Sequence, residues 1–155
     1  MQSSELVPGR RIGVVLHAGD DVLESIVEVC AANGIRQGYI PVFRGAFRSV
    51  RLVASRLPIA NQEVPLKDSI VVRYVEGVGS GSITWDERTE EPAIRLHAAV
   101  GAKDSMARGH VGFVLAATTH YFVELVIEEV LSPRMMRAPD PDAFGLESLS
   151  FQPEL

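Results

Sequence analysis

The sequence predicts an α+β domain: a mainly antiparallel sheet of seven to eight strands with one main α-helix packed on it. One stretch of helical period follows a short apolar strand near the N-terminus. After Gly34 the apolar period changes to two residues, and Gly, Pro and polar turns separate the segments. The 155 residues suit one domain, so we expect a disordered arm at 1–10 and a single domain over 11–155.

The helix is expected within HAGDDVLESIVEVCAANG, residues 17–34. Asp21 and Glu24 have the spacing of a capping box at a helix start, and Gly34 supplies a left-handed stop. Cys30, the only cysteine, falls on the apolar stripe of this helix, which predicts a buried thiol. A lone cysteine and an N-terminus without the apolar core of a signal peptide are typical of a cytoplasmic protein.

The strands are predicted from alternating apolar residues. They are RIGVVL, GYIPVF, AFRSVRLVA, SIVVRYVEG, GVGSGSITWDERTEEP, AIRLHAAVG, HVGFVLAA and HYFVELVIEEVL. Glu124 and Glu128 at i,i+4 would suit a helix in the last of these, but its β-branched and aromatic content favours a strand. The proline-rich C-terminus is expected to wrap over the surface and to end in a short edge strand, LESLSF.

The net charge of the chain limits the kinds of molecule that it is expected to bind. Twenty acidic and fifteen basic side chains give a net charge of −5, the wrong sign for a broad grip on phosphates. The arginines between 36 and 56 alternate as on a solvated strand face. Nothing approaches the roughly 18 apolar residues of a membrane span. The segment GVGSGS lacks a phosphate-binding loop pattern, and glycines of this kind more often permit bulges or close contacts.

Several motifs occur in a familiar order. They are LHAGDDVLESIVEVCAANGIRQGYI, GAFRSVRL, SGSITWDE, IRLHAAVG with ARGHVG and VELVIEEV, and MRAPDPDAFGLESLSF. Together they cover about 11–151 and resemble the plant and prokaryote conserved domain (PPC, also PCC), which plant nuclear proteins carry beside AT-hooks.

The resemblance implies a compact α+β fold, assembly as a homotrimer, and a DNA-binding or transcription-related role. In the plant proteins an Arg-Gly-Arg-Pro core enters the minor groove. This chain has only PGRR at 8–11, in the wrong order and without flanking basic residues. Direct binding to nucleic acid therefore has little physical support in the sequence.

Prokaryotic members of the family often show His-x-His and a later Gly-Gly-His, three imidazoles suited to a metal such as zinc. The matching positions here are Arg95, His97 and His110. Residues i and i+2 share one face of a strand, so Arg95 would put a fixed cation beside a bound ion and repel it. Glu124, which matches an acidic position of the family, could restore the number of ligands.

Several hypotheses remain open from these residues. His97 and His110 form a zinc site, or they are hydrogen-bonded at a protomer interface, or they join Arg95 and Glu124 in binding a small anion. His17 and His120 are further histidines without motif support. A hydrolase-like enzyme would need Glu124 and a histidine to converge, and no Ser-His-Asp order, G-x-S-x-G or H-E-x-x-H is present. The preferred hypothesis is a cytoplasmic homotrimeric ligand-binding or regulatory module.

Overall fold

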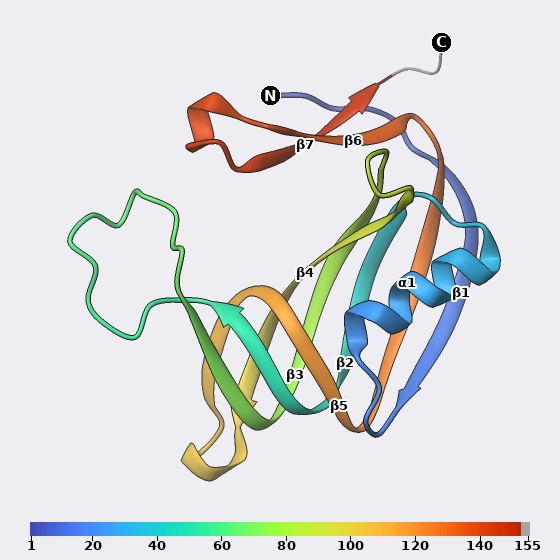
Figure 1. The fold of residues 1–155 in the computed structure, drawn as a ribbon. Coiled ribbons are helices and arrows are strands. Elements are labelled where there is room, and N and C mark those ends of the chain that lie inside the picture. The colour runs from blue at the N-terminus through green and yellow to red at the C-terminus, as the bar shows by residue number, and fades with distance from the viewer. Residues whose placement is uncertain (153–155) are drawn as a thin grey trace.

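A computed structural model describes residues 1–152 of the chain (Figure 1). Along the chain lie β1 (Val7–His17), α1 (Val22–Asn33), β2 (Gly38–Val53), β3 (Ser69–Asp86), β4 (Glu91–Ala102), β5 (Arg108–Ser132), β6 (Arg134–Pro139) and β7 (Glu147–Gln152), with 3-10 turns at Lys103–Ser105 and Pro141–Ala143. None of the helices in this part of the chain has the length and apolar character needed to cross a membrane.

The five long strands pair antiparallel in the order β1-β5-β2-β3-β4, and β4 also pairs with β5. Four strands therefore close into a small barrel, and β1 extends the sheet beyond it. β6 and β7 form a separate hairpin that lies over one end of the barrel (Figure 1). The predicted architecture was wrong in this respect: residues 1–152 are α+β only roughly, and they form a small barrel with one extra strand in place of a broad sheet of seven to eight strands with a helix packed on it.

The reason is that several segments predicted to be turns between strands are themselves part of longer, continuous strands. β2 runs through Pro41 with a register shift between Ile40 and Phe43, and β3 runs through the glycine-rich segment. Opposite the single residue Ala46, β5 has the three residues 120–122 and so two extra residues, because Gly45 pairs with Val123 and Phe47 with Thr119. Such bulges bend a strand without ending it, so few long strands curl into a barrel where many short ones were expected.

Alternate glycines on β3 make room for the barrel core. A Cβ on Gly79 would lie 2.4 Å from Cζ of Phe43 and 2.2 Å from the carbonyl oxygen of His97. A Cβ on Gly81 would lie 2.5 Å from a methyl carbon of Leu96. The glycines therefore face inward, where large side chains take the space they leave, and GVGSGS is a packing feature.

Helix α1 begins and ends as the sequence predicts. The Asp21 carboxylate accepts hydrogen bonds from the backbone N–H of Leu23 and of Glu24, at 2.9 and 3.1 Å. Gly34 ends the helix with a φ of 66°, in the left-handed region that favours glycine. Ile26 and Cys30 are fully buried, and the helix lies against β4 and β5.

The stretch 1–10, expected to be a disordered arm, enters β1 at Val7. Arg10 Nε donates to Glu129 Oε2 at 2.8 Å, and Gln2 Nε2 donates to the carbonyl oxygen of Phe151 at 2.8 Å. The N-terminal residues are thereby fastened to β5 and to β7. The Arg10 guanidinium also lowers the pKa of the Glu129 carboxyl, against the opposing effect of burial.

A methyl group at Gly79 should destabilise the barrel. Gly79→Ala would have to displace strand backbone and the ring of Phe43, and we expect it to lower the free energy of unfolding by about 1–3 kcal/mol. Gly13→Ala, on β1, is the control, because a Cβ there meets nothing within 4 Å. Urea denaturation measures both. Equal midpoints for the two variants would contradict the packing role of Gly79.

The Arg10–Glu129 pair should make stability depend on pH. Because the pKa of Glu129 is held below its ordinary value of 4.5, the stabilisation is complete above that pH and is lost as pH falls through the lowered value. We expect Arg10→Met to lower the denaturation midpoint at pH 7, and this deficit should shrink at an acid pH below 4.5 as the Glu129 carboxylate of the parent becomes protonated.

Arg11→Met is the matched control, since Arg11 pairs with Glu128, whose side chain is 36% exposed against 11% for Glu129. An exposed ion pair contributes little, so this variant should stay close to the parent at both pH values. If both variants lowered the denaturation midpoint by the same amount, or if the lowering did not change with pH, the Arg10–Glu129 ion pair would not contribute to stability.

Candidate functional site

One row of polar side chains crosses the outer face of the barrel. Tyr39 on β2 pairs with Ser82 on β3, and Ser82 pairs with Arg95 on β4. Ser80 and His97 form the next pair along the same two strands. Since neighbouring residues of a strand point to opposite faces, and Gly79, Gly81 and Leu96 face the core, this set points outward.

The β6–β7 hairpin brings a second guanidinium over this row. Arg137 Nη2 donates to Ser82 Oγ at 2.8 Å, and its Nη1 donates to the backbone carbonyl of Glu147 at 3.2 Å. The Glu147 carboxylate is paired with Arg95. The Arg95 guanidinium carbon lies 5.7 Å from the centre of the Phe113 ring, so it also has a cation–π contact.

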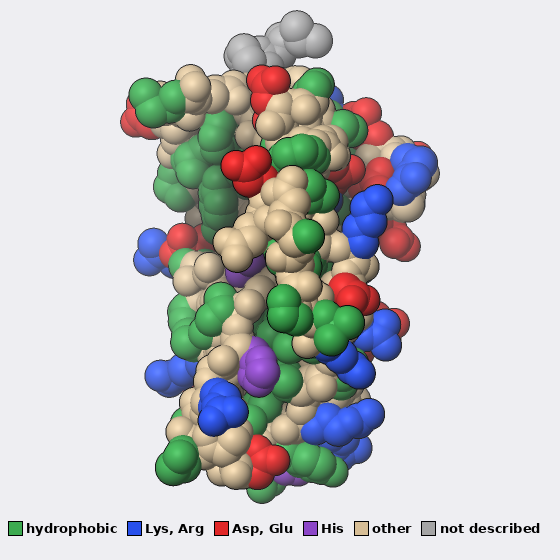
Figure 2. Space-filling view, turned by 90° about the vertical axis from the view of Figure 1, so that its left-hand side faces the viewer, with side chains coloured by type: hydrophobic (Ala, Val, Ile, Leu, Met, Phe, Trp, Pro, Cys, Tyr) green, Lys and Arg blue, Asp and Glu red, His purple; other side chains and the backbone are tan. Residues whose placement is uncertain are grey.

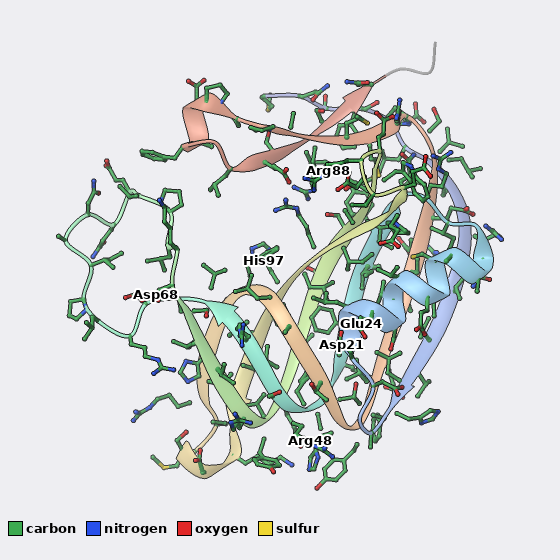
Figure 3. The ribbon with its side chains drawn as sticks, in the orientation of Figure 1. Asp21, Glu24, Arg48, Asp68, Arg88 and His97 are labelled. Carbon is green, nitrogen blue, oxygen red and sulfur yellow. The ribbon has the colours of Figure 1, made fainter. Side chains whose placement is uncertain are left out.

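These residues belong to a cleft of about 920 Å³. The hairpin, the outer face of the barrel and the loop 54–68 enclose it, and His97 stands on the barrel wall that faces this space (Figure 3). Figure 2 shows the same side of the molecule, where hydrophobic side chains gather around a hollow beneath the hairpin. The size is within the usual range for a pocket that binds a small molecule.

The polar end of the cleft has more positive than negative charge. Arg95 and Arg137 are both there, and Glu147 is the one carboxylate among the residues of the described chain that line it. Burial lowers the pKa of Arg137, and the charge of Arg95 lowers it further, although Glu147 acts in the opposite sense. Nε of Arg137 is buried without a hydrogen-bond partner within residues 1–152. The site can therefore accept an anion, which would balance the second guanidinium.

The structure separates the two histidines that the sequence analysis placed together. His97 pairs with Phe113, and Val100 pairs with His110. Paired residues share one face of a sheet, and Val100, three residues after His97, is buried in the core. His110 therefore lies on the face opposite to His97, and it does not line the cleft.

Other predicted residues also lie apart from the cleft. Glu124 Oε2 accepts from Arg44 Nε at 3.1 Å. His17 ends β1, and the ring of His120 lies 5.4 Å from that of Tyr74. Within residues 1–152, no three His, Cys, Asp or Glu side chains are placed to hold one metal ion. The residues of a single chain therefore do not fit a zinc site made by His97 and His110.

Sequence reasoning identified Arg95 and His97 but missed Arg137, Ser82 and Glu147. Arg137 and Glu147 come from the C-terminal stretch, which was expected to wrap over the surface and to end in a short edge strand, LESLSF, with no role in a site. A signal was present there: MMRAP and ESLSF are short strand-like segments on either side of a turn rich in Asp, Pro and Gly. What they would cover could not be read from that pattern.

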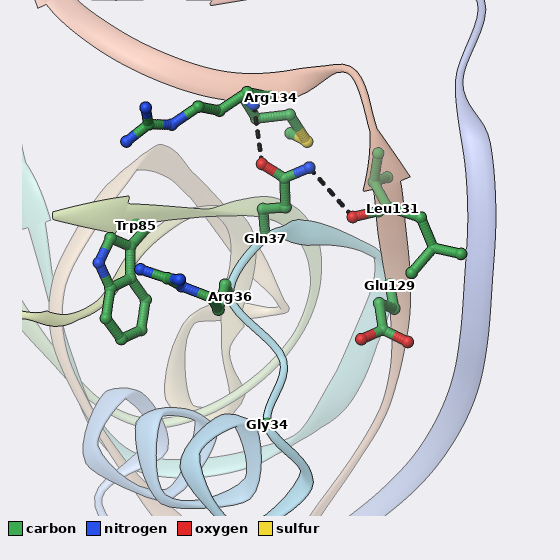
Figure 4. A pocket seen from close by; sticks show the side chains of 9 residues that line it. Gly34, Arg36, Gln37, Trp85, Glu129, Leu131 and Arg134 are labelled. Atoms are coloured by element: carbon green, nitrogen blue, oxygen red, sulfur yellow. Dashed lines mark hydrogen bonds between the residues drawn. The ribbon is translucent and has the colours of Figure 1, made fainter. Parts of the chain in front are cut away.

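A second pocket, of about 470 Å³, lies where α1 ends beside β5 and β6 (Figure 4). Gln37 donates to the carbonyl oxygens of Val130 and Pro133 and accepts from the backbone N–H of Met135. Glu129, which also lines it, is bound to Arg10. The polar groups of Gln37 and Glu129 are therefore bound by other parts of the chain, and the Arg36 guanidinium carbon lies 4.1 Å from the centre of the Trp85 ring.

Comparison with solved structures shows where this fold recurs. A plant- and prokaryote-conserved (PPC) protein from Pyrococcus horikoshii superposes with a TM-score of 0.76 at 16% identity, over 100% of each chain. A candidate DNA-binding protein from Bacteroides thetaiotaomicron gives 0.72 at 23% identity, over 94% of this chain and 97% of that one. A metal-containing protein from Archaeoglobus fulgidus gives 0.73 at 20% identity, over 96% and 98%.

At these identities the likeness shows the fold alone. Among curated proteins none matches the sequence. The model of the Plants and Prokaryotes Conserved (PCC) domain matches residues 3–131, which is most of the chain. On that match, the chain belongs to the Plants and Prokaryotes Conserved (PCC) domain family.

Proposed function

We propose that this chain is a ligand-binding or regulatory module whose cleft under the β6–β7 hairpin takes a small anion. The observation that carries the proposal is the meeting of Arg95 and Arg137 over a single carboxylate, that of Glu147. A guanidinium presents a planar set of N–H donors that matches a carboxylate or a phosphate. Ser82 and His97 stand beside them as further polar groups.

Anion binding should depend on Arg137. Phosphate and acetate should raise the thermal midpoint of the parent protein more than chloride of equal ionic strength, since ligands stabilise the state they bind. Arg137→Met should abolish this difference. Its own midpoint without ligand should stay within a few degrees of the parent, because the Glu147 carboxylate keeps its pairing with Arg95 and the repulsion between the two guanidinium groups is removed.

The control variant is Arg48→Met, which removes an exposed arginine at the opposite end of the barrel (Figure 3). It should keep the whole response to phosphate and acetate. Differential scanning fluorimetry gives the midpoints, and calorimetric titration gives the affinities. A response that survives in Arg137→Met, or that chloride reproduces, would refute the proposal.

We further propose that the protein works as a homotrimer, as the family resemblance implies, in a reducing cytoplasm that suits its one buried cysteine. An exposed apolar row supports self-association. Val78, Ala99 and Val111 are paired side by side across β3, β4 and β5 on the outer face. Val78 is 51% exposed and Val111 75%, and a second copy of the chain would cover them.

A charge in this row should break the assembly. We expect light scattering to give three times the mass of one chain for the parent and a smaller mass for Val111→Glu. Leu131→Glu is a control for the added charge, because Leu131 is a comparably exposed residue near the other end of β5, at 54%. A parent protein that is monomeric at micromolar concentration would count against the trimer.

The second candidate function is DNA binding, which the Bacteroides relative favours. The net charge of −5 opposes it. The cations that could contribute include Arg48 and Arg73, exposed on the neighbouring strands β2 and β3. Binding of this kind would appear as a shift of a mixed-sequence duplex at low salt that added salt abolishes. Such a shift, lost in Arg48→Met and kept in Arg137→Met, would favour this candidate over the first.

A further inference from the structure

We infer that the anion held in the cleft carries an apolar body, as a medium-chain or aromatic carboxylate does, and that inorganic ions are not its natural occupants. The inference rests on the proposed function and extends it from the charge of the ligand to its chemical class. It follows from what lines the cleft away from its two arginines.

Apolar side chains from three separate parts of the chain meet in this cleft. Leu66 comes from the loop 54–68, Leu115 from β5, and Leu146 from the turn of the hairpin. They are 37%, 43% and 56% exposed. Single exposed leucines are ordinary on a protein surface, but leucines from three segments around one concave space mark a place where apolar area can be buried.

More buried apolar residues continue this lining toward the arginines. Phe113 and Leu149 are partly buried, and both line the cleft. Phe113 lies between the two regions, because its ring is 5.4 Å from that of His97 and 5.7 Å from the Arg95 guanidinium carbon. A ligand that reaches from the guanidinium groups to the leucines would therefore pass over an aromatic ring.

A small hydrated ion would use only half of this site. Phosphate or acetate can satisfy the guanidinium groups, but it leaves the leucines in contact with water. A ligand with a carboxylate at one end and an apolar body at the other uses both regions, and the volume of about 920 Å³ has room for such a molecule. The pattern, apolar walls with a few convergent polar groups, is that of a small-molecule site rather than of a surface that attracts ions.

The test is a chain-length series of straight-chain carboxylates: acetate, butanoate, hexanoate and octanoate. Binding is followed by the NMR shifts of the backbone amides of Gly81 and Gly112, two glycines in the wall of the cleft. Burial of each further methylene should lower the dissociation constant by roughly fourfold, until the chain is too long for the cleft. Octanol and octylamine, which have the same chain without the negative charge, should bind at least about tenfold more weakly than octanoate.

Two pairs of variants separate the charged end from the apolar end. Leu115→Ser should weaken octanoate about fivefold and leave acetate unchanged. Leu131→Ser, an exposed leucine of the same strand outside the cleft, should change neither. Arg137→Met should weaken octanoate to the level of octanol, and Arg48→Met should not.

Each outcome decides a separate claim. Equal affinities for acetate and octanoate, both lost in Arg137→Met, would overturn the apolar body and leave the anion site standing. Equal affinities for octanoate and octanol, both kept in Arg137→Met, would overturn the anion site and with it this inference. Amide shifts that are absent for every acid at millimolar concentration would overturn both.

Discussion

Pairing between β4 and β5 closes the barrel, and the register of that pairing decides which side chains can meet. It places His97 opposite Phe113 on the outer face and His110 beside Val100 on the inner one. A shift of one residue would exchange the two faces of β5. The same closure leaves Arg95, His97 and Ser82 on an outer wall that the hairpin can cover. Without it these strands would end in free edges and the cleft would lose a side.

The cleft brings together charges that would separate in an open chain. Arg95 and Arg137 repel each other, and burial disfavours the charge of Arg137, so its pKa is lowered. Within the described cleft, these two guanidinium groups contact one carboxylate, that of Glu147, together with the Ser82 hydroxyl and the Glu147 backbone carbonyl. The hydrophobic core, in which Phe43 and Leu96 pack against the glycines of β3, stabilises the barrel. This stability offsets the cost of placing two like charges close together in the cleft. Groups whose pKa is shifted by burial and by a neighbouring like charge are common at binding sites, where a ligand of opposite charge can balance them.

Membership of the PCC family accounts for the fold of this chain, whereas its chemistry depends on the particular residues of the site. Solved structures with this fold include a candidate DNA-binding protein and a metal-containing protein. Fold does not determine function, and the site does. In this chain, Arg95 and His97 share the outer face of β4, and His110 lies on the opposite face of β5. A fixed positive charge beside His97 favours contact with a negatively charged group over contact with a cation.

The sequence by itself determined the local features. The helix begins after Asp21 and ends at Gly34, because the capping side chain and the left-handed glycine act on residues only a few positions away. The alternation of apolar residues predicted that the segments of β2 to β5 are strands. It also determined that Arg95 and His97 share a face. Only the tertiary structure decided that the strands run through their bulges into a barrel, that Arg137 reaches Ser82 across 55 positions, and that His110 turns away from His97. Strand closure and the docking of the hairpin depend on contacts between residues far apart in the chain, which a periodicity of two or four residues does not record.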